Sequence, residues 1–176
     1  MTAFNFYSHG TQDIYPTFLQ RQHGLAPSMV GTINVIANIG AILGCFVFGI
    51  LSQHFGRRRT MISSALISIL VVYVWAFSDA LPLVILGAFL MQFFNQGAWS
   101  CVPVHLNELS PRAARGTFPG TVYQLGNLMA SINLPLQTTI AVQYGFGVAM
   151  ASVALCAALA ISVLLYFGPE AHSTDL

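Results

Sequence analysis

The sequence contains no lysine and has few charged residues of any kind. Only 6% of its 176 residues are charged and 56% are hydrophobic, and its mean hydropathy is +0.72. A soluble domain carries roughly 25% charged residues, so this chain lacks the charge needed to cover a water-facing surface. Its net charge of +1 gives no electrostatic reason to expect a nucleic acid partner. These shortages indicate a protein embedded in a lipid bilayer.

Cysteine and histidine are too few and too scattered to indicate a disulfide framework or a metal site. Cys45, Cys101 and Cys156 each lie in or at the end of an apolar run, and no two are close in sequence. Cysteines of this kind are small packing residues. The five histidines show no ligand spacing. We therefore expect neither a metal nor a cofactor.

Long apolar runs dominate the rest of the chain. A helix that crosses a bilayer needs about 20 mainly apolar residues, and no segment alternates polar and apolar residues as a barrel strand would. Proline, glycine and charged residues gather between the runs, where helices end. We predict a single domain, 1–176, that is an all-α membrane protein with six transmembrane helices. The predicted spans are 1–19, 29–51, 60–77, 83–104, 117–141 and 146–167.

The distribution of arginine predicts the orientation of these spans. Loops 52–59 and 105–116 contain Arg57, Arg58, Arg59, Arg112 and Arg115, and the opposite side has only Arg21. Short cytoplasmic loops are enriched in basic residues. We therefore expect both loops and both termini on the cytoplasmic side of a cell membrane, either inner or plasma. Met1 lies at the edge of a span without the basic lead-in of a signal peptide. We expect a longer protein of which this chain is a part, and a true half-length protein is the alternative.

Polar residues form stripes on some spans and not on others. The stripes on spans 83–104 and 117–141 each cover about 100° of helix surface, and the stripe on span 1–19 covers about 140°. Single amides within a membrane bundle often only join helices, but striped spans at 1–19, 29–51, 83–104 and 117–141 favour an aqueous cavity. Spans 60–77 and 146–167 lack stripes and would face lipid. The candidate cavity residues are Asn34, Asn38, Gln92, Asn95, Gln96, Trp99, Tyr123, Gln124 and Asn127.

Glycine and proline within the spans predict close packing and helix breaks. Gly40 and Gly44 have the spacing that lets two helix backbones approach closely. Pro119 and Pro135 lie within span 117–141, and Pro103 is expected to end span 83–104. Breaks are tolerated in a membrane where the released carbonyls meet protein or cavity water. Ordinary kinks with no role in movement are the alternative.

The first span carries an ionisable pair. Asn5, His9, Asp13 and Thr17 are spaced by four residues, so His9 and Asp13 can touch on a helix. An ionisable residue within a span costs several kcal/mol and marks a functional site by default. Histidine changes charge near neutral pH, so the pair could take up and release a proton. An interfacial helix or a static buried pair would explain the same residues.

These residues also carry a family resemblance. The pattern N-x-x-S-H-x-T-Q-D-x-x-x-T resembles the signature in the seventh helix of fungal lactate/pyruvate:proton symporters, which related bacterial sialate:proton and carboxylate symporters share. In that family the segment lines the substrate path. The resemblance therefore implies a substrate and proton path formed by Asn5, Ser8, His9, Thr11, Gln12, Asp13 and Thr17.

Two loops resemble wider major facilitator patterns. Residues 49–59 resemble the G-x-x-x-D-x-x-G-R-R/K-R/K loop, with glutamine at the position of the usual acid, and residues 108–116 resemble the E-L-x-P-x-x-x-R-G loop. The resemblance implies helices seven to twelve, which form the C-terminal half of a twelve-helix fold. The motif residues are Gly49, Gln53, Gly56, Arg57, Arg58, Arg59, Glu108, Pro111, Arg115 and Gly116.

The resemblance implies a secondary transporter that moves a proton together with a small organic acid by alternating access. The acid would be a monocarboxylate such as lactate or pyruvate, or sialic acid. The expected partners are the acid, the proton, the lipid bilayer and a missing N-terminal six-helix half. The alternative is a six-helix half that assembles as a homodimeric pore or as a carrier of another substrate. An enzyme is not expected, because the His9–Asp13 pair has no second acid, nucleophile elbow or metal set beside it.

Overall fold

A computed structural model describes residues 1–168, and helices account for most of this part of the chain. No strand occurs among these residues. A 3₁₀ turn, η1 (Arg112–Ala114), lies in the one long connection. The α-helices are α1 (Thr2–Gln12), α2 (Tyr15–Arg21), α3 (Pro27–Phe55), α4 (Arg57–Phe77), α5 (Leu81–Leu109), α6 (Phe118–Ala130), α7 (Asn133–Tyr144) and α8 (Phe146–Phe167).

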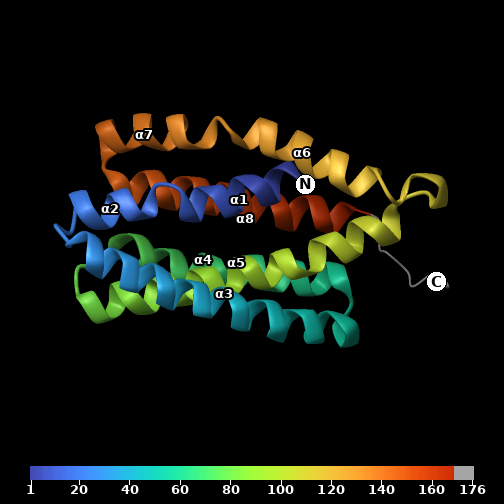
Figure 1. Cartoon of the computed structure of the whole chain (residues 1–176), viewed down its shortest axis with the longest axis horizontal. Helices are drawn as coiled ribbons and strands as arrows, with labels where there is room; N and C mark the ends of the chain where they lie inside the picture. Colours follow the sequence, from blue (N-terminus) through green and yellow to red (C-terminus); the bar gives the residue numbers. More distant parts are fainter. Residues whose placement is uncertain (169–176) are drawn as a thin grey trace.

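The helices make six passes along one common direction (Figure 1). By length and composition, α3, α4, α5 and α8 can each cross a membrane unbroken. The other two passes are α1 with α2, and α6 with α7, each broken near its middle. In Figure 1, α6 and α7 form an upper layer, α1, α2 and α8 a middle layer, and α3, α4 and α5 a lower layer. The prediction of an all-α fold with six passes is confirmed.

Proline explains both broken passes. A proline has no N–H to donate to the carbonyl four residues earlier, and its ring clashes with that carbonyl. Pro16 stands four residues after Gln12, where α1 ends, and Pro135 stands four residues after Ser131, the residue that follows α6. The prediction of one continuous helix over 1–19 is therefore wrong, and Thr17 lies on α2, beyond the break.

Pro103 does not end its helix, which corrects the prediction for span 83–104. Helix α5 continues to Leu109, so Glu108 belongs to its last turn and not to a loop. Buried residues on both sides of the proline, Val102 and His105, keep the helix packed against its neighbours. That packing outweighs the roughly 3 kcal/mol that an interior proline costs a helix.

Helix α3 packs tightly against α5 through its glycines. A Cβ atom on Gly40 would meet the carbonyl of Phe89, and one on Gly44 would meet the carbonyl of Phe93. Any larger residue would push the two backbones apart. The close approach predicted from the spacing of these glycines is confirmed.

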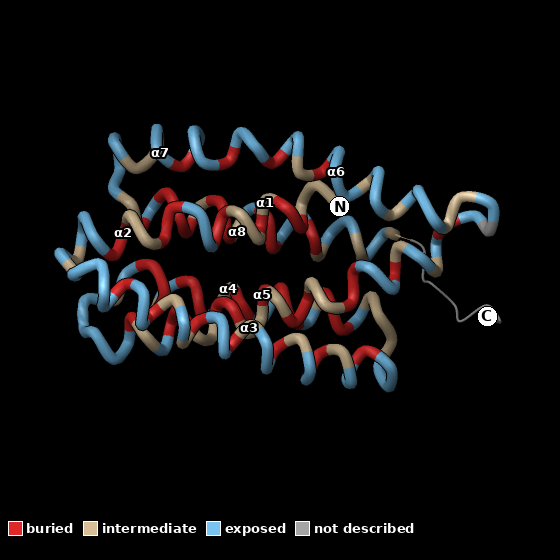
Figure 2. Tube along the Cα trace, viewed as in Figure 1, coloured by how far each residue is buried: buried red, intermediate tan, exposed pale blue. Residues whose placement is uncertain are grey.

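Helices α4 and α8 are more buried in this chain than we expected for spans that lack polar stripes. Half of the most apolar stretch of each is buried, compared with 28% for α3. Trp75 of α4 is almost fully buried and stacks on Tyr15 with ring centroids 5.4 Å apart. Most of α6 and α7, in contrast, is exposed (Figure 2). Trp75 reaches the interior, while Leu70 and Tyr73 of the same helix stay exposed, so one side of span 60–77 is free to face lipid.

Candidate functional site

The ionisable pair lies at the end of α1, beside the break. His9 Nδ1 is 3.1 Å from Asp13 Oδ2 and 3.3 Å from Oδ1. The side chains are 44% and 35% exposed, so the pair is open to solvent on one side of this chain. Asp13 follows the last turn of the helix, where the unpaired carbonyls carry partial negative charge. The carboxylate and the helix end therefore both place negative charge beside the His9 ring.

Two buried amides on α7 hold the end of α1. Gln137 Nε2 donates to the carbonyl of Gly10 at 2.8 Å, and Asn133 Nδ2 donates to the carbonyl of Phe6 at 3.3 Å. Both amide side chains are fully buried. Gly10 belongs to the last four residues of α1, whose carbonyls have no partner within the helix. Gln137 thus supplies a hydrogen bond that the break removed.

These two amides were not among the predicted site residues. Asn133 and Gln137 lie four residues apart on opposite sides of Pro135, and each is 127 residues from its partner on α1. Four-residue spacing of amides in an apolar span was the available signal, since it places both side chains on one face of the helix.

A hydrogen-bond network joins α1 to α5. Gln12 Nε2 donates to Gln92 Oε1 at 3.1 Å and lies 3.3 Å from Ser8 Oγ. Asn95 Nδ2 donates to the hydroxyl of Thr11 at 2.6 Å, within the buried interface. Three residues of the predicted path, Ser8, Thr11 and Gln12, therefore contact one another or α5. Of these, Gln12 is the exposed one and Thr11 the buried one.

Gln12 and Gln92 also border a cavity of about 230 Å³, which we call the polar cavity. Asn34 and Asn38 of α3 form another wall, and Asn38 Nδ2 donates to the carbonyl of Asn34 at 2.8 Å. Gln96 lines a more open hollow of about 540 Å³ that shares Gln12, Asn38 and Gln92 with the polar cavity. The structure thus brings together stripes from three of the four spans expected around a cavity. Tyr15 and Trp75 complete the wall and were not among the predicted residues.

The remaining predicted residues lie away from this cavity. Asn5 is buried and donates to the backbone carbonyl of Tyr123 at 3.2 Å. Trp99 packs edge-on between Phe4 and Tyr123, with centroid distances of 6.1 and 5.8 Å. Asn5 and Trp99 therefore join α1 and α5 to α6. The other two predicted residues of α6 differ, since Gln124 is exposed and Asn127 has a buried amide oxygen without a partner.

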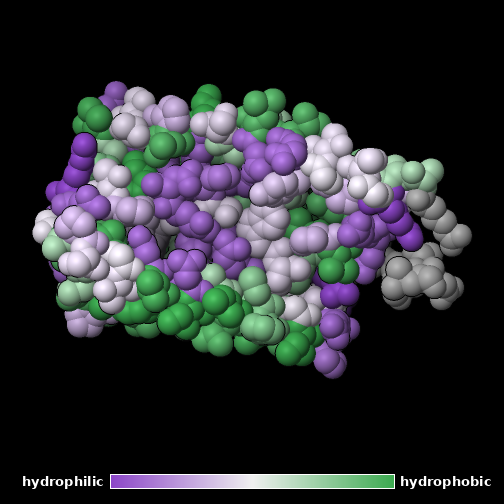
Figure 3. Space-filling model, viewed as in Figure 1, coloured by the Kyte–Doolittle hydropathy of each residue, from purple (hydrophilic) through white to green (hydrophobic). Residues whose placement is uncertain are grey.

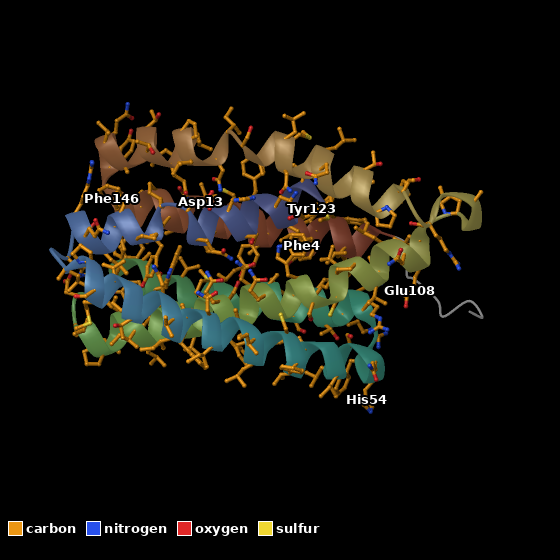
Figure 4. The ribbon with its side chains drawn as sticks, in the orientation of Figure 1. Phe4, Asp13, His54, Glu108, Tyr123 and Phe146 are labelled. Carbon is orange, nitrogen blue, oxygen red and sulfur yellow. The ribbon has the colours of Figure 1, made fainter. Side chains whose placement is uncertain are left out.

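The predicted loop motifs meet at one end of the bundle. Arg57 Nε lies 3.6 Å from Glu108 Oε1, and Arg57 Nη1 donates to Ser52 Oγ at 2.6 Å. Gly56 links α3 to α4 with φ +88°, a conformation that favours glycine. Figure 4 shows Glu108 near one end of the molecule and Asp13 toward the other.

The other motif residues surround this ion pair in sequence. Gln53 and Arg59 are exposed, and Arg58 donates to the carbonyl of Gly168 at 2.8 Å. Pro111 precedes η1, and Arg115 follows it with a buried Nε that has no hydrogen-bond partner. A Cβ on Gly49 or Gly116 would meet nothing, so packing does not explain either glycine.

Hydrophilic side chains form a band along one face of the molecule, between apolar margins (Figure 3). Within residues 1–168, no three His, Cys, Asp or Glu side chains are grouped as metal ligands. The assembled site can therefore offer amides and hydroxyls for hydrogen bonding and one ionisable pair for proton exchange.

Comparison with known proteins identifies the family. The family model of the Major Facilitator Superfamily matches residues 1–175. A carboxylic acid transporter protein homolog from Saccharomyces cerevisiae is 38% identical over 141 residues, which cover 80% of this chain and 23% of the relative. The facilitated glucose transporter member 1 of solute carrier family 2 from Gallus gallus is 30% identical over 130 residues, which cover 69% of this chain and 25% of the relative.

The fold matches part of a solved transporter. The xylose transporter XylE from E. coli, in an inward-open conformation, superposes with a TM-score of 0.67 at 20% identity. The match covers 97% of this chain and 44% of XylE. The chain thus spans less than half the length of this transporter and about a quarter of the two relatives above. Family match, identity and fold agree: the chain is a multi-pass membrane protein that belongs to the major facilitator superfamily of transporters, not to a family of enzymes.

Proposed function

We propose that this chain is the C-terminal six-helix half of a carrier that moves a small organic acid together with a proton by alternating access. The observation that carries the proposal is the 3.1 Å contact between His9 and Asp13 at the break in α1. Ionisable residues within membrane helices are rare and line ion or substrate paths. A broken helix is also where transporters of other families bind ions and substrates.

The pair suits proton exchange because both side chains can bind and release a proton. The 3.1 Å contact between His9 Nδ1 and Asp13 Oδ2 lets a proton pass directly from one side chain to the other. The pair is exposed on one side of this chain, so water can reach it from that side. A change of access between the two membrane sides would then be able to load and unload one proton.

An organic acid is the favoured substrate for two reasons. The relative from Saccharomyces cerevisiae is named as a carboxylic acid transporter homolog, and it is 38% identical over 80% of this chain. The pattern from Asn5 to Thr17 resembles that of carboxylate:proton symporters. No arginine lies on a wall of the polar cavity within the described residues, so the charge of the acid would be balanced by the proton or by the other half of the carrier.

A sugar is the second candidate substrate. Gln12, Gln92, Asn34 and Asn38 around the polar cavity are neutral amides that can donate to and accept from hydroxyl groups. Relatives at 30% and 32% identity are named glucose transporters. This reading needs no ionisable pair, so it leaves His9 and Asp13 without a role.

The loops support the proposed half and its proposed orientation. The arginine-rich connections near Arg57 and Arg115 resemble the cytoplasmic loops of a second half, and basic residues favour the cytoplasmic side. Both termini would then be cytoplasmic, in the cell or plasma membrane. The N-terminal half, the acid and the proton are the proposed partners.

Counterflow in proteoliposomes tests the function in a carrier that contains this chain together with an N-terminal half. Vesicles loaded with unlabelled lactate should accumulate labelled lactate, and an inward proton gradient should drive uptake without preloading. Pyruvate and sialic acid are tested as competitors beside glucose. Competition by glucose alone, with no response to the proton gradient, would favour the sugar reading and reject the acid symporter.

A further inference from the structure

A second hollow lies between α1, α7 and α8, and we call it the apolar groove. Its volume is about 570 Å³, and it shares no lining residue with the polar cavity. Phe6, Leu136, Ile140 and Val153 form much of its wall, and Ala160 and Leu164 continue it along α8. The side chain of Ala160 on α8 is too short to reach α7, which leaves the space between the two helices open.

The groove offers a ligand almost no hydrogen bonds. The two hydroxyls on its wall already have partners: Ser152 donates to the carbonyl of Ala149 at 3.0 Å, and Thr2 Oγ1 lies 3.5 Å from the sulfur of Met129. A polar substrate would lose its hydration there without compensation. A hydrocarbon chain has no hydrogen bonds to water to lose, so the apolar wall favours an aliphatic occupant.

The length of the groove matches one leaflet of a bilayer. From residue 152 to residue 164, α8 rises by about 18 Å at 1.5 Å per residue. The hydrocarbon core of a bilayer is about 30 Å thick, so one leaflet occupies about 15 Å. A single acyl chain that runs parallel to α8 would therefore fill the groove over its length.

Positive charge lies at the end of the groove that Leu164 marks. Gly168 stands one helical turn beyond Leu164, and Arg58 Nη1 donates to its carbonyl at 2.8 Å. Arg57 and Arg59 flank Arg58 at the start of α4. Basic residues between helices at the cytoplasmic surface bind anionic lipid head groups. We propose that the apolar groove binds one acyl chain of an anionic phospholipid whose phosphate lies at Arg58.

Photo-crosslinking in nanodiscs tests this site without reference to transport. The full chain is reconstituted in phosphatidylcholine with a trace of phosphatidylglycerol that carries a diazirine on its acyl chain. Residue-resolved mass spectrometry should find label on groove residues such as Cys156 and Ala160. Label spread equally over the exposed α8 residues Leu159 and Val163 would overturn the proposal.

Matched variants separate a site from general lipid contact. Ala160→Phe fills the groove from an exposed position and should lower groove labelling by roughly tenfold, the effect of losing about 1.4 kcal/mol of binding. Val163→Phe, one turn along the exposed face, should leave it unchanged. If Ala160→Phe misfolds, Cys156→Phe fills the same wall from another exposed position. Equal labelling of the filled and control variants would contradict the proposal.

Arg58→Gln tests the head group. It should reduce the preference for phosphatidylglycerol over a phosphatidylcholine probe by roughly fivefold, the contribution of one basic residue near an anionic surface. Arg21→Gln, at the opposite end of the bundle, is the control and should have no effect on groove labelling. An unchanged preference in Arg58→Gln would reject the proposed phosphate contact. Cross-links from the groove to another polypeptide segment in place of lipid would reject the occupant itself.

Discussion

Replacing Gln137 by leucine tests whether α7 completes the hydrogen bonding of the broken α1. Leucine keeps most of the buried volume but removes the amide that donates to the carbonyl of Gly10 at 2.8 Å. A buried carbonyl left without a partner costs about 1–3 kcal/mol, and hydrogen bonds between membrane helices contribute about 0.6 and at most about 1.7 kcal/mol. We therefore expect Gln137→Leu to lower the free energy of unfolding by about 1–2 kcal/mol.

The assay is reversible unfolding of the chain in mixed micelles by titration with SDS, followed by circular dichroism. Gln143→Leu is the control, because Gln143 is exposed on the same helix. Asn133→Leu should have a smaller effect than Gln137→Leu, since its bond to the carbonyl of Phe6 is longer at 3.3 Å. Equal unfolding free energies for Gln137→Leu and Gln143→Leu would refute the role given to α7.

Three further predictions concern topology, assembly and the Arg57–Glu108 ion pair. Cysteines at Arg58 and Ala113 should react with a membrane-impermeant reagent only from the cytoplasm, and one at Asp79 only from outside; labelling of Ala113 and Asp79 from the same side would contradict the six-span topology. The purified 176-residue chain should not transport alone, because half a cavity leaves polar stripes facing lipid; robust uptake would favour a homodimer. Glu108→Gln should lower the free energy of unfolding by up to about 1 kcal/mol. The double change Arg57→Glu with Glu108→Arg should restore stability in thermal unfolding. No loss of stability in Glu108→Gln would show that the ion pair does not stabilise the fold.

The sequence was sufficient for features that depend on neighbouring residues. The six passes follow from the length of apolar runs, and the contact of His9 with Asp13 follows from four-residue spacing on one helix. The packing of Gly40 against α5 was also predictable, because small residues four apart permit close approach. In each case the physical cause lies within one helix or one short segment.

Features that depend on the meeting of distant segments were not predictable in the same way. The amides of Asn133 and Gln137 find their partners on α1 only after the chain folds, 127 residues away. Trp75 reaches the polar cavity from a span without polar stripes, because its position depends on how α4 packs. Pro16 was a local signal for the break in α1, and its missing N–H toward Gln12 was enough to predict it.

Residues that share a stripe in sequence also proved to have different surroundings. Gln92 and Asn95 lie on one stripe of α5, yet Gln92 lines the polar cavity and Asn95 is fully buried against Thr11. Helical periodicity assigns a face to a residue, but the depth of that face depends on the packed neighbour. Stripes therefore predict where a cavity lies more reliably than which side chains line it.

We propose that the His9–Asp13 pair couples substrate movement to the proton. Asp13→Asn keeps the shape and hydrogen bonding of the side chain but removes its titratable charge. His9→Ala should weaken substrate affinity as well as accumulation, and Asn5→Ala, with no charge to lose, should mainly raise the apparent binding constant. Because misfolding would lower every activity together, the contrast among the three variants carries the information.

The most direct measurement compares proton-driven accumulation with substrate exchange in proteoliposomes that contain the whole carrier with Asp13→Asn. If Asp13 carries or controls the proton, accumulation driven by an inward proton gradient should collapse. Exchange of internal for external substrate should persist, because it needs no net proton movement. If normally expressed Asp13→Asn still concentrates the acid with an unchanged pH dependence, the proton travels elsewhere and Asp13 is only a structural partner of His9.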